Sequence, residues 1–294
     1  MASIDIVIPC AGRAADLTRL LTSIHVHCKQ SLEACVSTIT VTDDRPSSDL
    51  AQSLETDFPR VSYVHGPARG PAANRNHGAG QGWADWILFL DDDCYVESDL
   101  LRFYSAVMQS HPKADVFEGA IQPVGERPNG NHHAPLNLKG GYLWSCNMLV
   151  RRAAFTAVSG FDDRFPYPCM EDVDLRERLL GSGINMLFVP RALVRHPWRS
   201  VSERELSRSI ISHAIYATKH PAFARQWTLL HASRLALGRA RLYAAGGFAT
   251  IALSKYRTVA YDLVVPFLLL AVTRWPLLRR TLDRHYRNRA GAVA

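Results

Sequence analysis

The chain has 294 residues and a mass of 32.8 kDa, enough for one large α/β domain or two modest ones. Hydrophobic residues make up 47% of it and charged residues 21%, which excludes disordered, fibrous and coiled-coil proteins. The net charge of +7 is unevenly spread, because residues 199–294 hold 16 Lys and Arg against 4 Asp and Glu. An acidic body therefore carries a basic C-terminal region, which could bind nucleic acid or an anionic membrane surface.

Six cysteines are scattered along the chain and form no C-x-x-C pair. This spacing argues against a zinc site or a disulfide framework, and favours reduced thiols packed as small hydrophobic side chains. The first residues lack the basic leader and the long apolar core of a signal peptide. We therefore expect a cytoplasmic protein, peripheral on the cytosolic face of the membrane.

Strand and helix patterns alternate through the first half of the chain. Strand patterns, rich in β-branched and apolar residues, lie at residues 4–8, 36–42, 63–64 and 86–90. The first strand is expected to stop at Pro9, and helices are expected after the first and last strands with Asp16 and Ser98 as N-caps. The alternation predicts an α/β fold, a doubly wound sheet that binds ligands at the carboxyl ends of its strands.

Beyond Val189 the pattern becomes helical. A capping box at residues 202–205 predicts the start of a helix that Pro221 ends, and a second helix is expected over residues 223–245. A last apolar run, residues 259–272, is shorter than the ~20 residues that a spanning helix needs. Its basic and aromatic flanks favour an amphipathic helix at an anionic membrane surface, and the alternative is a helix packed on the acidic body or on a second subunit.

Three consecutive carboxylates, Asp91, Asp92 and Asp93, follow the strand expected at 86–90. Adjacent carboxylates after a buried strand are costly unless a positive group neutralises them. A hard divalent cation, Mg²⁺ or Mn²⁺, prefers oxygen ligands of this kind and keeps positions open for substrate phosphates. The alternative is a solvated acidic turn that caps a helix.

Two further segments carry residues suited to binding phosphate or moving protons. Residues 66–82 are rich in glycine and include Arg69 and Arg75, whose guanidinium groups suit diphosphate oxygens, although the segment lacks the Walker pattern. Glu171 and Asp172 begin a later helix. They either complement the dipole of that helix or bring one carboxylate to the same site as the aspartate cluster.

A series of short motifs runs along residues 4–198. In chain order they are I-V-I-P, T-D-D-R-P-S, A-N-R-N-H-G, L-D-D-D, M-L-V-R-R-A-A-F, G-F-D-D-R-F, E-D-V-D-L and A-L-V-R-H. Together they resemble the family-two glycosyltransferases, whose GT-A fold is a Rossmann-like, mostly parallel sheet flanked by helices. The resemblance implies a nucleotide-sugar-binding catalytic domain over residues 1–198, and a basic, apolar helical region over residues 199–294.

The resemblance implies that the nucleotide-sugar lies against the ends of the first two strands. Asp44 matches the aspartate that reads the nucleotide base, with Asp43 beside it and the backbone of Pro9 and Cys10 nearby. Where the family often has Pro-x-x-Asn-Arg, this chain reads P-C-A-G-R, with glycine in place of asparagine. Arg13, the last residue of that segment, is also expected to contact the nucleotide-sugar.

The family pattern also implies a set of metal ligands. Asp91 and Asp93 match the outer positions of its D-x-D motif, and His196 matches a histidine that completes the metal site in some members. These three residues are the expected ligands of Mg²⁺ or Mn²⁺, and a surface histidine is the alternative for His196. Arg75 matches an arginine that faces the nucleotide, and Asp91 and Asp92 are expected to contact the nucleotide-sugar as well.

Asp172, paired with Glu171, matches the family's catalytic base, which deprotonates the acceptor hydroxyl. One base and no separate nucleophile imply inversion at the sugar. UDP is the favoured nucleotide, and the expected acceptor is a saccharide or a lipid-linked glycan. The Q-x-x-R-W motif of processive synthases is absent from the sequence, so a single addition is favoured. Trp144 and Trp198 either stack on sugar faces or belong to the core.

Two other functions compete with this interpretation. A nucleotidyltransferase that makes activated sugars would carry a glycine-rich loop with a lysine after the first strand, and residues 9–16 lack one. A nucleic-acid-binding protein would interleave basic and aromatic residues on one surface. The apolar residues of the C-terminal region cluster instead at 259–272, so no nucleic-acid partner is expected.

Overall fold

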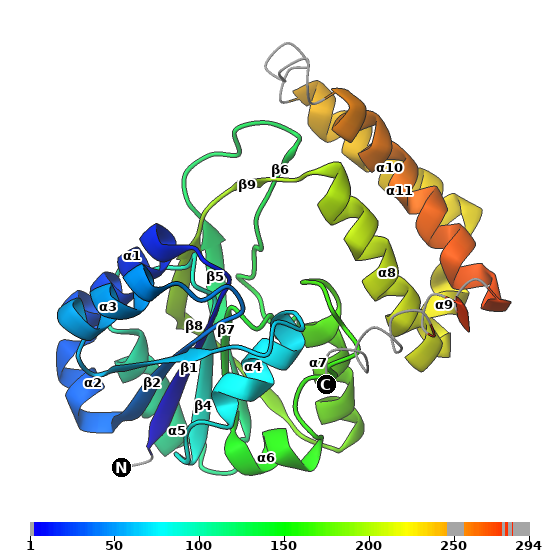
Figure 1. Ribbon diagram of the computed structural model, residues 1–294. Coiled ribbons are helices and arrows are strands. Elements are labelled where there is room, and N and C mark those ends of the chain that lie inside the picture. The colour runs from blue at the N-terminus through cyan, green and yellow to red at the C-terminus, as the bar shows by residue number, and fades with distance from the viewer. Residues whose placement is uncertain (1–2, 246–255, 278–279, 282–283, 285–294) are drawn as a thin grey trace. The chain divides into compact units, whose positions relative to one another are not determined.

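The computed structural model describes residues 3–245, 256–277, 280–281 and 284 (Figure 1). The chain folds as two units. Unit 1 comprises Met1–Val124, Pro135–Asp163 and Glu171–Pro197, and unit 2 comprises Gly125–Ala134, Arg164–Met170 and Trp198–Ala294. Two segments expected within residues 1–198, namely 125–134 and 164–170, thus belong to unit 2, and the domain boundary at 198/199 stays a prediction.

A seven-stranded sheet in the order β3-β2-β1-β4-β7-β5-β8 forms the centre of unit 1 (Figure 1). Its strands are β1 Ile4–Cys10, β2 Val36–Asp43, β3 Val61–His65, β4 Trp86–Leu90, β5 Val116–Pro123, β7 Asn147–Arg151 and β8 Met186–His196. Only β7 runs against the others, since it pairs antiparallel with both β4 and β5. The carboxyl ends of the six parallel strands therefore lie at one edge of the sheet.

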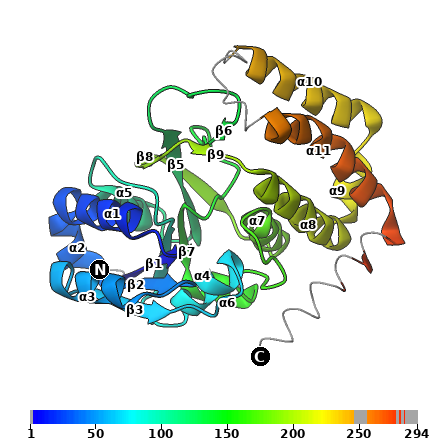
Figure 2. The ribbon, with the colours of Figure 1, turned by 45° about the horizontal axis from the view of Figure 1, so that its top comes forward.

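Helices cover both faces of this sheet (Figures 1 and 2). They are α1 Ala14–His27, α2 Lys29–Cys35, α3 Ser48–Asp57, α4 Pro71–Ala79, α5 Leu100–Ser110, α6 Arg152–Ala157 and α7 Glu171–Gly181. Side chains alternate along a strand. Ile6 and Ile8 accordingly join a buried cluster with apolar residues of α1, α2 and α5, whereas Val7 lies against Gly78 of α4. Burial on both faces explains why β4 is apolar throughout.

The N-termini of α1 and α5 differ from the sequence predictions in their caps. The apolar face expected for each helix is buried, but α1 begins at Ala14 with no side-chain cap, and Asp16 instead pairs with Arg19 in its first turn. The N-cap of α5 is Asp99, which accepts a hydrogen bond from Arg102 N, and not Ser98. A carboxylate is as good an N-cap as a hydroxyl, so the sequence pattern alone could not decide between the adjacent residues Ser98 and Asp99.

One strand extends further than expected, and another occupies residues that were expected to be helical. β1 continues through Pro9 to Cys10. Beyond Val7 it pairs with β2 and no longer with β4. The N–H that proline lacks is therefore not needed for a hydrogen bond to β4. The expectation that the chain turns helical beyond Val189 is wrong, since β8 continues to His196. A register shift between Gly119 and Ala120 lets β8 resume its pairing with β5 after a local irregularity.

Unit 2 is mainly helical. It contains the short antiparallel pair β6 His132–His133 and β9 Arg199–Ser200, and the helices α8 Glu203–Lys219, α9 Pro221–Gln226, α10 Leu229–Ala245 and α11 Tyr256–Arg274. The capping box that begins α8 is present as predicted. The single helix expected over 223–245 is wrong, because Trp227 adopts an extended conformation between α9 and α10 and is buried with Leu206, Val265 and Leu269.

The apolar run 259–272 lies in α11, which packs against α8 and α10 of its own unit (Figure 1). Val259, Val265 and Leu269 are buried there. Asp262, also buried, accepts a hydrogen bond from the Tyr243 hydroxyl at 2.9 Å and lies 3.4 Å from Arg239 Nε. Among the described residues, no helix is both long and apolar enough to cross a membrane. Membrane contact through 259–272 stays a prediction.

Candidate functional site

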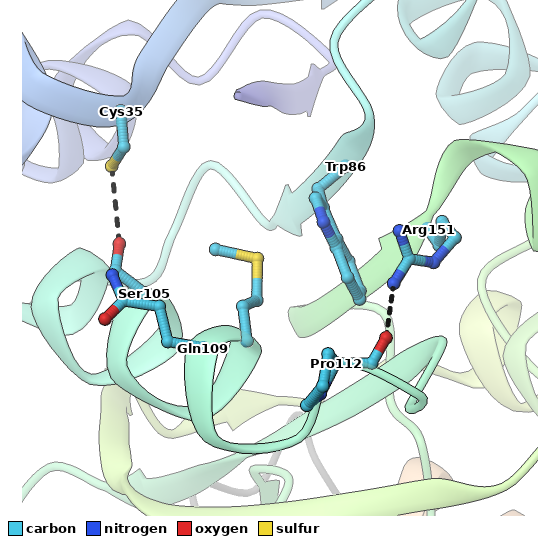
Figure 3. Close-up of a pocket in the computed structure, with 7 residues that line it drawn as sticks. Cys35, Trp86, Ser105, Gln109, Pro112 and Arg151 are labelled. Atoms are coloured by element: carbon cyan, nitrogen blue, oxygen red, sulfur yellow. Dashed lines mark hydrogen bonds between the residues drawn. The ribbon is translucent and has the colours of Figure 1, made fainter. Parts of the chain in front are cut away.

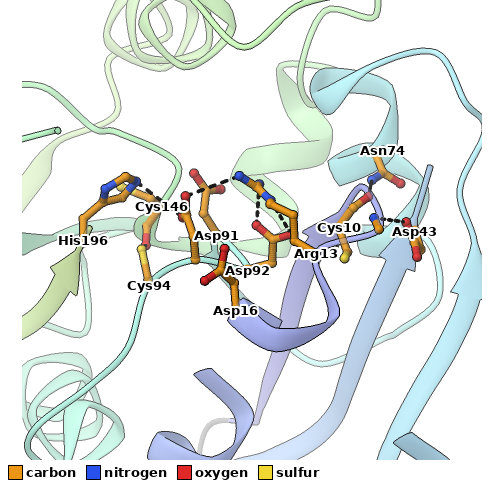
Figure 4. A network of polar contacts seen from close by, with 12 residues as sticks. Cys10, Arg13, Asp16, Asp43, Asn74, Asp91, Asp92, Cys94, Cys146 and His196 are labelled. Atoms are coloured by element: carbon orange, nitrogen blue, oxygen red, sulfur yellow. Dashed lines mark hydrogen bonds and ion pairs between the residues drawn. The ribbon is translucent and has the colours of Figure 1, made fainter. Parts of the chain in front are cut away.

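Several predicted site residues of unit 1 lie together at the carboxyl edge of its sheet, and Figure 4 shows Cys10, Arg13, Asp43, Asp91, Asp92 and His196. Cys10, Asp43 and His196 are the last residues of β1, β2 and β8, and the aspartate cluster 91–93 follows β4 directly. Glu171 and Asp172 open α7. This is the edge at which a doubly wound sheet binds its ligands.

Arg75 of α4 joins the aspartate cluster to the acidic pair of α7. Its Nη2 donates to Asp91 Oδ1 at 2.7 Å and its Nη1 to Glu171 Oε1 at 3.1 Å. The guanidinium also lies over the ring of Phe161, with its Cζ 5.6 Å from the ring centroid. Arg75 and Glu171 are both buried, so each charge depends on the other for compensation.

Asp91 and Asp172 have opposite pKa shifts, although Arg75 is close to both. Burial alone would raise the pKa of Asp91, but the contact with Arg75 outweighs it and lowers that pKa. For Asp172, burial prevails over the attraction of Arg75 and raises the pKa, while the backbone N–H groups of Val173 and Ser145 hold the carboxylate in place. A half-buried carboxylate with a raised pKa is suited to accept a proton.

Arg13, the second arginine of the site, contacts the other two aspartates (Figure 4). Its Nε donates to Asp92 Oδ2 at 3.0 Å, and its Nη1 lies 3.4 Å from Asp93 Oδ2. Asp92 is fully buried, and this burial raises its pKa to about 6 against the opposing charge of Arg13. The side chain of Asp92 therefore holds the loop after β1, whereas Arg13 remains partly exposed.

The residues expected to bind the cation present suitable donor atoms. His196 Nδ1 lies 2.8 Å from the carbonyl oxygen of Pro197 and must carry a proton, because a carbonyl only accepts. In the neutral ring, Nε2 then faces Asp93 Oδ1 at 3.4 Å with its lone pair. A backbone carbonyl that orients the far nitrogen is the usual support of a metal-binding histidine. The donor set fits a divalent cation.

Cys94 lies next to this pair, within 4.8 Å of both ligand atoms. Its pKa is raised well above the ordinary value by its contact with Cys146 and by burial, so it stays a neutral thiol. Mg²⁺ and Mn²⁺ prefer oxygen ligands, and a neutral thiol is a poor ligand for either ion. Asp93 and His196 are therefore the candidate ligands that the structure brings together, while Asp91 is held by Arg75 and stays a predicted ligand.

At the end of β2, Asp43 and Asp44 hold two loops. Asp43 is fully buried and accepts hydrogen bonds from the N–H groups of Gly12 and Arg45 and from the Tyr63 hydroxyl. Asp44, which is partly exposed, accepts from Ala68 N at 2.9 Å and Gly70 N at 3.1 Å. Burial raises the pKa of Asp44. Of the two, only Asp44 offers surface to a ligand.

Contacts join the predicted site residues at this edge into separate groups around Arg13, around Arg75 and at the ends of β1 and β2. Arg13 follows the loop that Asp43 holds, Asp93 links Arg13 to His196, and Arg75 links Asp91 to α7. The backbone of Cys10 accepts from Asp44 N, and Pro9 pairs with Thr42 within the sheet.

Buried polar residues that the sequence predictions missed support the site. Asn74 donates to the backbone carbonyls of Cys10 and Thr42 and so joins the ends of β1 and β2. Glu118 accepts hydrogen bonds from the segment 137–143. The sequence signal for Glu118 was a charged residue inside the apolar run V-F-E-G-A-I. Asn74 lies in the same motif as Arg75, and only Arg75 was interpreted there.

A cavity of about 270 Å³ lies elsewhere in unit 1 (Figure 3). It is lined by Cys35, Trp86, Ser105, Met108, Gln109, Pro112 and Arg151. Trp86 begins β4, and the aspartate cluster follows its end, so the cavity lies toward the opposite edge of the sheet. None of the predicted site residues lines it.

Comparison with known proteins identifies the family and the fold. The family described as Glycosyl transferase family 2 matches residues 5–158, which is more than half of the chain. The crystal structure of GalNAc-T7 with UDP, GalNAc and Mn²⁺ has a TM-score of 0.57 to this chain at 14% identity, and the match covers 90% of this chain and 54% of that one. The fold is therefore the GT-A fold of glycosyltransferases. The chain belongs to glycosyl transferase family 2, as its motifs predicted.

Two curated relatives come from Mycobacterium tuberculosis. Pre-mycofactocin glycosyltransferase is 28% identical over 240 residues, which cover 74% of this chain and 48% of the relative. N-acetylglucosaminyl-diphospho-decaprenol L-rhamnosyltransferase is 36% identical over 97 residues, which cover 30% of this chain and 31% of the relative. The chain thus spans at most about half the length of these relatives.

Replacing the central arginine tests the coupling that it provides. We expect Arg75→Met to lower the free energy of unfolding by about 3–5 kcal/mol, because it leaves Glu171 buried without a cation. The double variant Arg75→Met/Glu171→Leu should regain part of that loss. Urea unfolding followed by tryptophan fluorescence measures both.

The control is Arg69→Met, since Arg69 and its partner Asp163 are each about one-third exposed and their ion pair should contribute less than about 1 kcal/mol. If the losses of the two single variants simply added in the double variant, Arg75 and Glu171 would not depend on each other.

Proposed function

We propose that this chain is an inverting, divalent-metal-dependent glycosyltransferase. It moves a sugar from a nucleoside-diphosphate sugar, with UDP favoured, to a hydroxyl of a saccharide or lipid-linked acceptor, one addition at a time. The observation that carries the proposal is the guanidinium of Arg75, which joins the donor-side carboxylate Asp91 to the acidic pair that contains the candidate base Asp172. Membership of family 2 favours sugar transfer over nucleotidyl transfer.

The donor would lie against Asp44, Arg13 and the aspartate cluster. Asp91, Asp93 and His196 would hold Mg²⁺ or Mn²⁺, which when bound offsets the negative charge that develops on the departing diphosphate. UDP and Mn²⁺ accompany GalNAc-T7 in its crystal structure, which supports this choice. Arg75, already positioned by Asp91 and Glu171, adds a fixed positive charge on the same side.

Asp172 would accept the proton of the acceptor hydroxyl. The hydroxyl oxygen would attack the anomeric carbon from the face opposite the diphosphate. Glu171 is buried against Arg75, so Asp172 is the member of the pair with exposed surface. In this proposal Asp172 is a single base with no nucleophile beside it, and that arrangement corresponds to inversion. The raised pKa strengthens Asp172 as a base.

A lipid-linked acceptor would require the protein at a membrane, and unit 2 offers a surface for it. The acceptor named for the rhamnosyltransferase relative is a diphospho-decaprenol, which supports this class of substrate. α10 exposes the leucines Leu229, Leu230, Leu235, Leu237 and Leu242. Leu230 and Leu237 share a face with the exposed Arg234 and Arg241, because these positions follow helical spacing. Apolar and basic groups on one face suit an anionic membrane surface, so we propose a peripheral protein on the cytosolic face.

The base is tested by Asp172→Asn. We expect transfer to fall at least about 10²-fold while the affinity for UDP in Mn²⁺ stays within about twofold, because the amide cannot accept the proton. In the wild type, transfer should rise with pH as Asp172 loses its proton, and the midpoint should lie above the ordinary aspartate range. Release of UDP from a panel of UDP-sugars, with and without acceptor, gives the rates.

Asp115→Asn serves as the control, since Asp115 pairs with Arg151 toward the opposite edge of the sheet. Transfer by the Asp172→Asn protein at the wild-type rate would place the base elsewhere.

The cation site is tested by Asp93→Asn and His196→Gln. Each should weaken Mn²⁺ binding at least about tenfold, because each removes a candidate ligand. Electron paramagnetic resonance of free Mn²⁺ during titration reports the affinity without any need for turnover. Asp16→Asn is the matched control, since Asp16 pairs with Arg19 in the first turn of α1. Unchanged Mn²⁺ affinity in both ligand variants would contradict this assignment.

The membrane surface is tested by the double variant Leu230→Glu/Leu237→Glu. We expect its binding to vesicles of phosphatidylglycerol and phosphatidylcholine to weaken at least about tenfold, because apolar burial is lost and like charge is added. Wild-type binding should also weaken as salt rises. Val26→Glu, at an exposed position of α1, is the control, and equal sedimentation of all three proteins with vesicles would remove α10 from the contact.

A further inference from the structure

Two aromatic side chains of unit 1 stack in the segment before β7. The rings of Tyr142 and Trp144 have centroids 4.6 Å apart and planes inclined by 24°. Trp144 is half-buried and packs against the core of the sheet, whereas 46% of Tyr142 is exposed. Trp144 therefore covers one face of the Tyr142 ring and limits its motion, so the exposed surface of Tyr142 is a fixed aromatic surface.

Glu118 of β5 holds the backbone of this segment. The carboxylate, itself buried, accepts hydrogen bonds from Gly141 N at 2.6 Å, Tyr142 N at 2.8 Å, Leu143 N, and Asn137 Nδ2 at 2.7 Å. Leu143 has a φ of 53°, which a residue with a Cβ adopts only under constraint. Charge-assisted hydrogen bonds to three successive amides supply that constraint. Glu118 thereby positions Tyr142.

The segment runs beside the candidate catalytic groups. Because β7 pairs antiparallel with β4, the residues just before Asn147 lie next to the aspartate cluster 91–93. The backbone N–H of Ser145, one residue after Trp144, bonds to the carboxylate of Asp172. Arg176 follows Asp172 by one turn of α7, and it donates to the carbonyl oxygen of Gly141 at 2.5 Å. Both ends of the aromatic pair are therefore tied to the surroundings of the base.

We propose that Tyr142, backed by Trp144, is the subsite for the acceptor sugar. The C–H face of a pyranose ring is apolar and packs against an aromatic face, which leaves the ring hydroxyls free at its edge. A sugar stacked on Tyr142 would direct an edge hydroxyl to Asp172, while the nucleotide lies on the far side of the aspartate cluster. The proposal rests on the proposed function, since the acceptor and its base are parts of it.

Saturation-transfer NMR on the full chain tests this subsite with the methyl pyranosides of glucose, galactose, mannose, rhamnose and N-acetylglucosamine as probes. We expect the wild type to transfer saturation to the ring C–H protons of at least one probe. Tyr142→Ala should weaken that binding at least about tenfold, and Tyr142→Phe should retain it, because the ring face is what binds. UDP affinity in Mn²⁺, measured by calorimetry, should stay within about twofold in both variants.

Glu118→Gln tests the positioning of the segment and keeps its volume. The amide loses one acceptor, so methyl glycoside affinity should fall while UDP affinity does not, a split that general destabilisation would not produce. Equal glycoside binding by the wild type and Tyr142→Ala, or no glycoside binding by the wild type, overturns the subsite. A chain that binds glycosides through Tyr142 but does not bind UDP contradicts only the proposed function.

Discussion

The contact of Arg75 with Asp91 and Glu171 is the interaction on which the candidate site depends. Three charged side chains, from α4, α7 and the end of β4, meet there, and two of them have almost no exposure to water. Burying a carboxylate without a cation is costly, so Arg75 allows α7 to begin beside the aspartate cluster. Asp172, the next residue, then comes to the same edge of the sheet without sharing the strong contact that lowers the pKa of Asp91. The position of Arg75 thus gives the two carboxylates different properties: Asp91 stays ionised, and Asp172 is the better base.

The remaining carboxylates of the edge are held by local contacts. Asp43 and Asp92 are fully buried, and they hold the loop after β1 through Gly12 and Arg13. Asp44 shapes the loop after β3, where Gly66 is required because a Cβ there would lie 2.4 Å from Asp44 Oδ1. Asp93 and His196 face each other with donor atoms suited to a cation. The charged residues of the motifs therefore divide into residues that hold the loops and residues whose donor atoms suit a ligand.

In unit 2, burial changes how the apolar run 259–272 is interpreted. The run 259–272 is interrupted by Asp262, which in isolation suggests a polar face turned to water or to headgroups. In the structure Asp262 is buried between α11 and α10, where Tyr243 and Arg239 contact it, and the apolar residues on either side pack against α8 and α10. The exposed apolar surface lies instead on α10, whose leucines alternate with arginines and showed no long apolar run in the sequence.

By itself, the sequence determined the family, the GT-A fold and the residues that gather at the carboxyl edge, because these are carried by local patterns: apolar strands, the charged residues directly after them, and motifs in a preserved order. It also located the acidic start of α7 and the capping box of α8. Only the tertiary structure decided which carboxylates are buried and which are exposed, that β8 extends to His196, and that Trp227 breaks a helix to enter a core. Those outcomes depend on contacts between residues far apart in the chain, such as Arg75 with Glu171 and Glu118 with Leu143. A local pattern holds no information about such partners, and burial with a partner is what sets both the charge and the conformation of these residues.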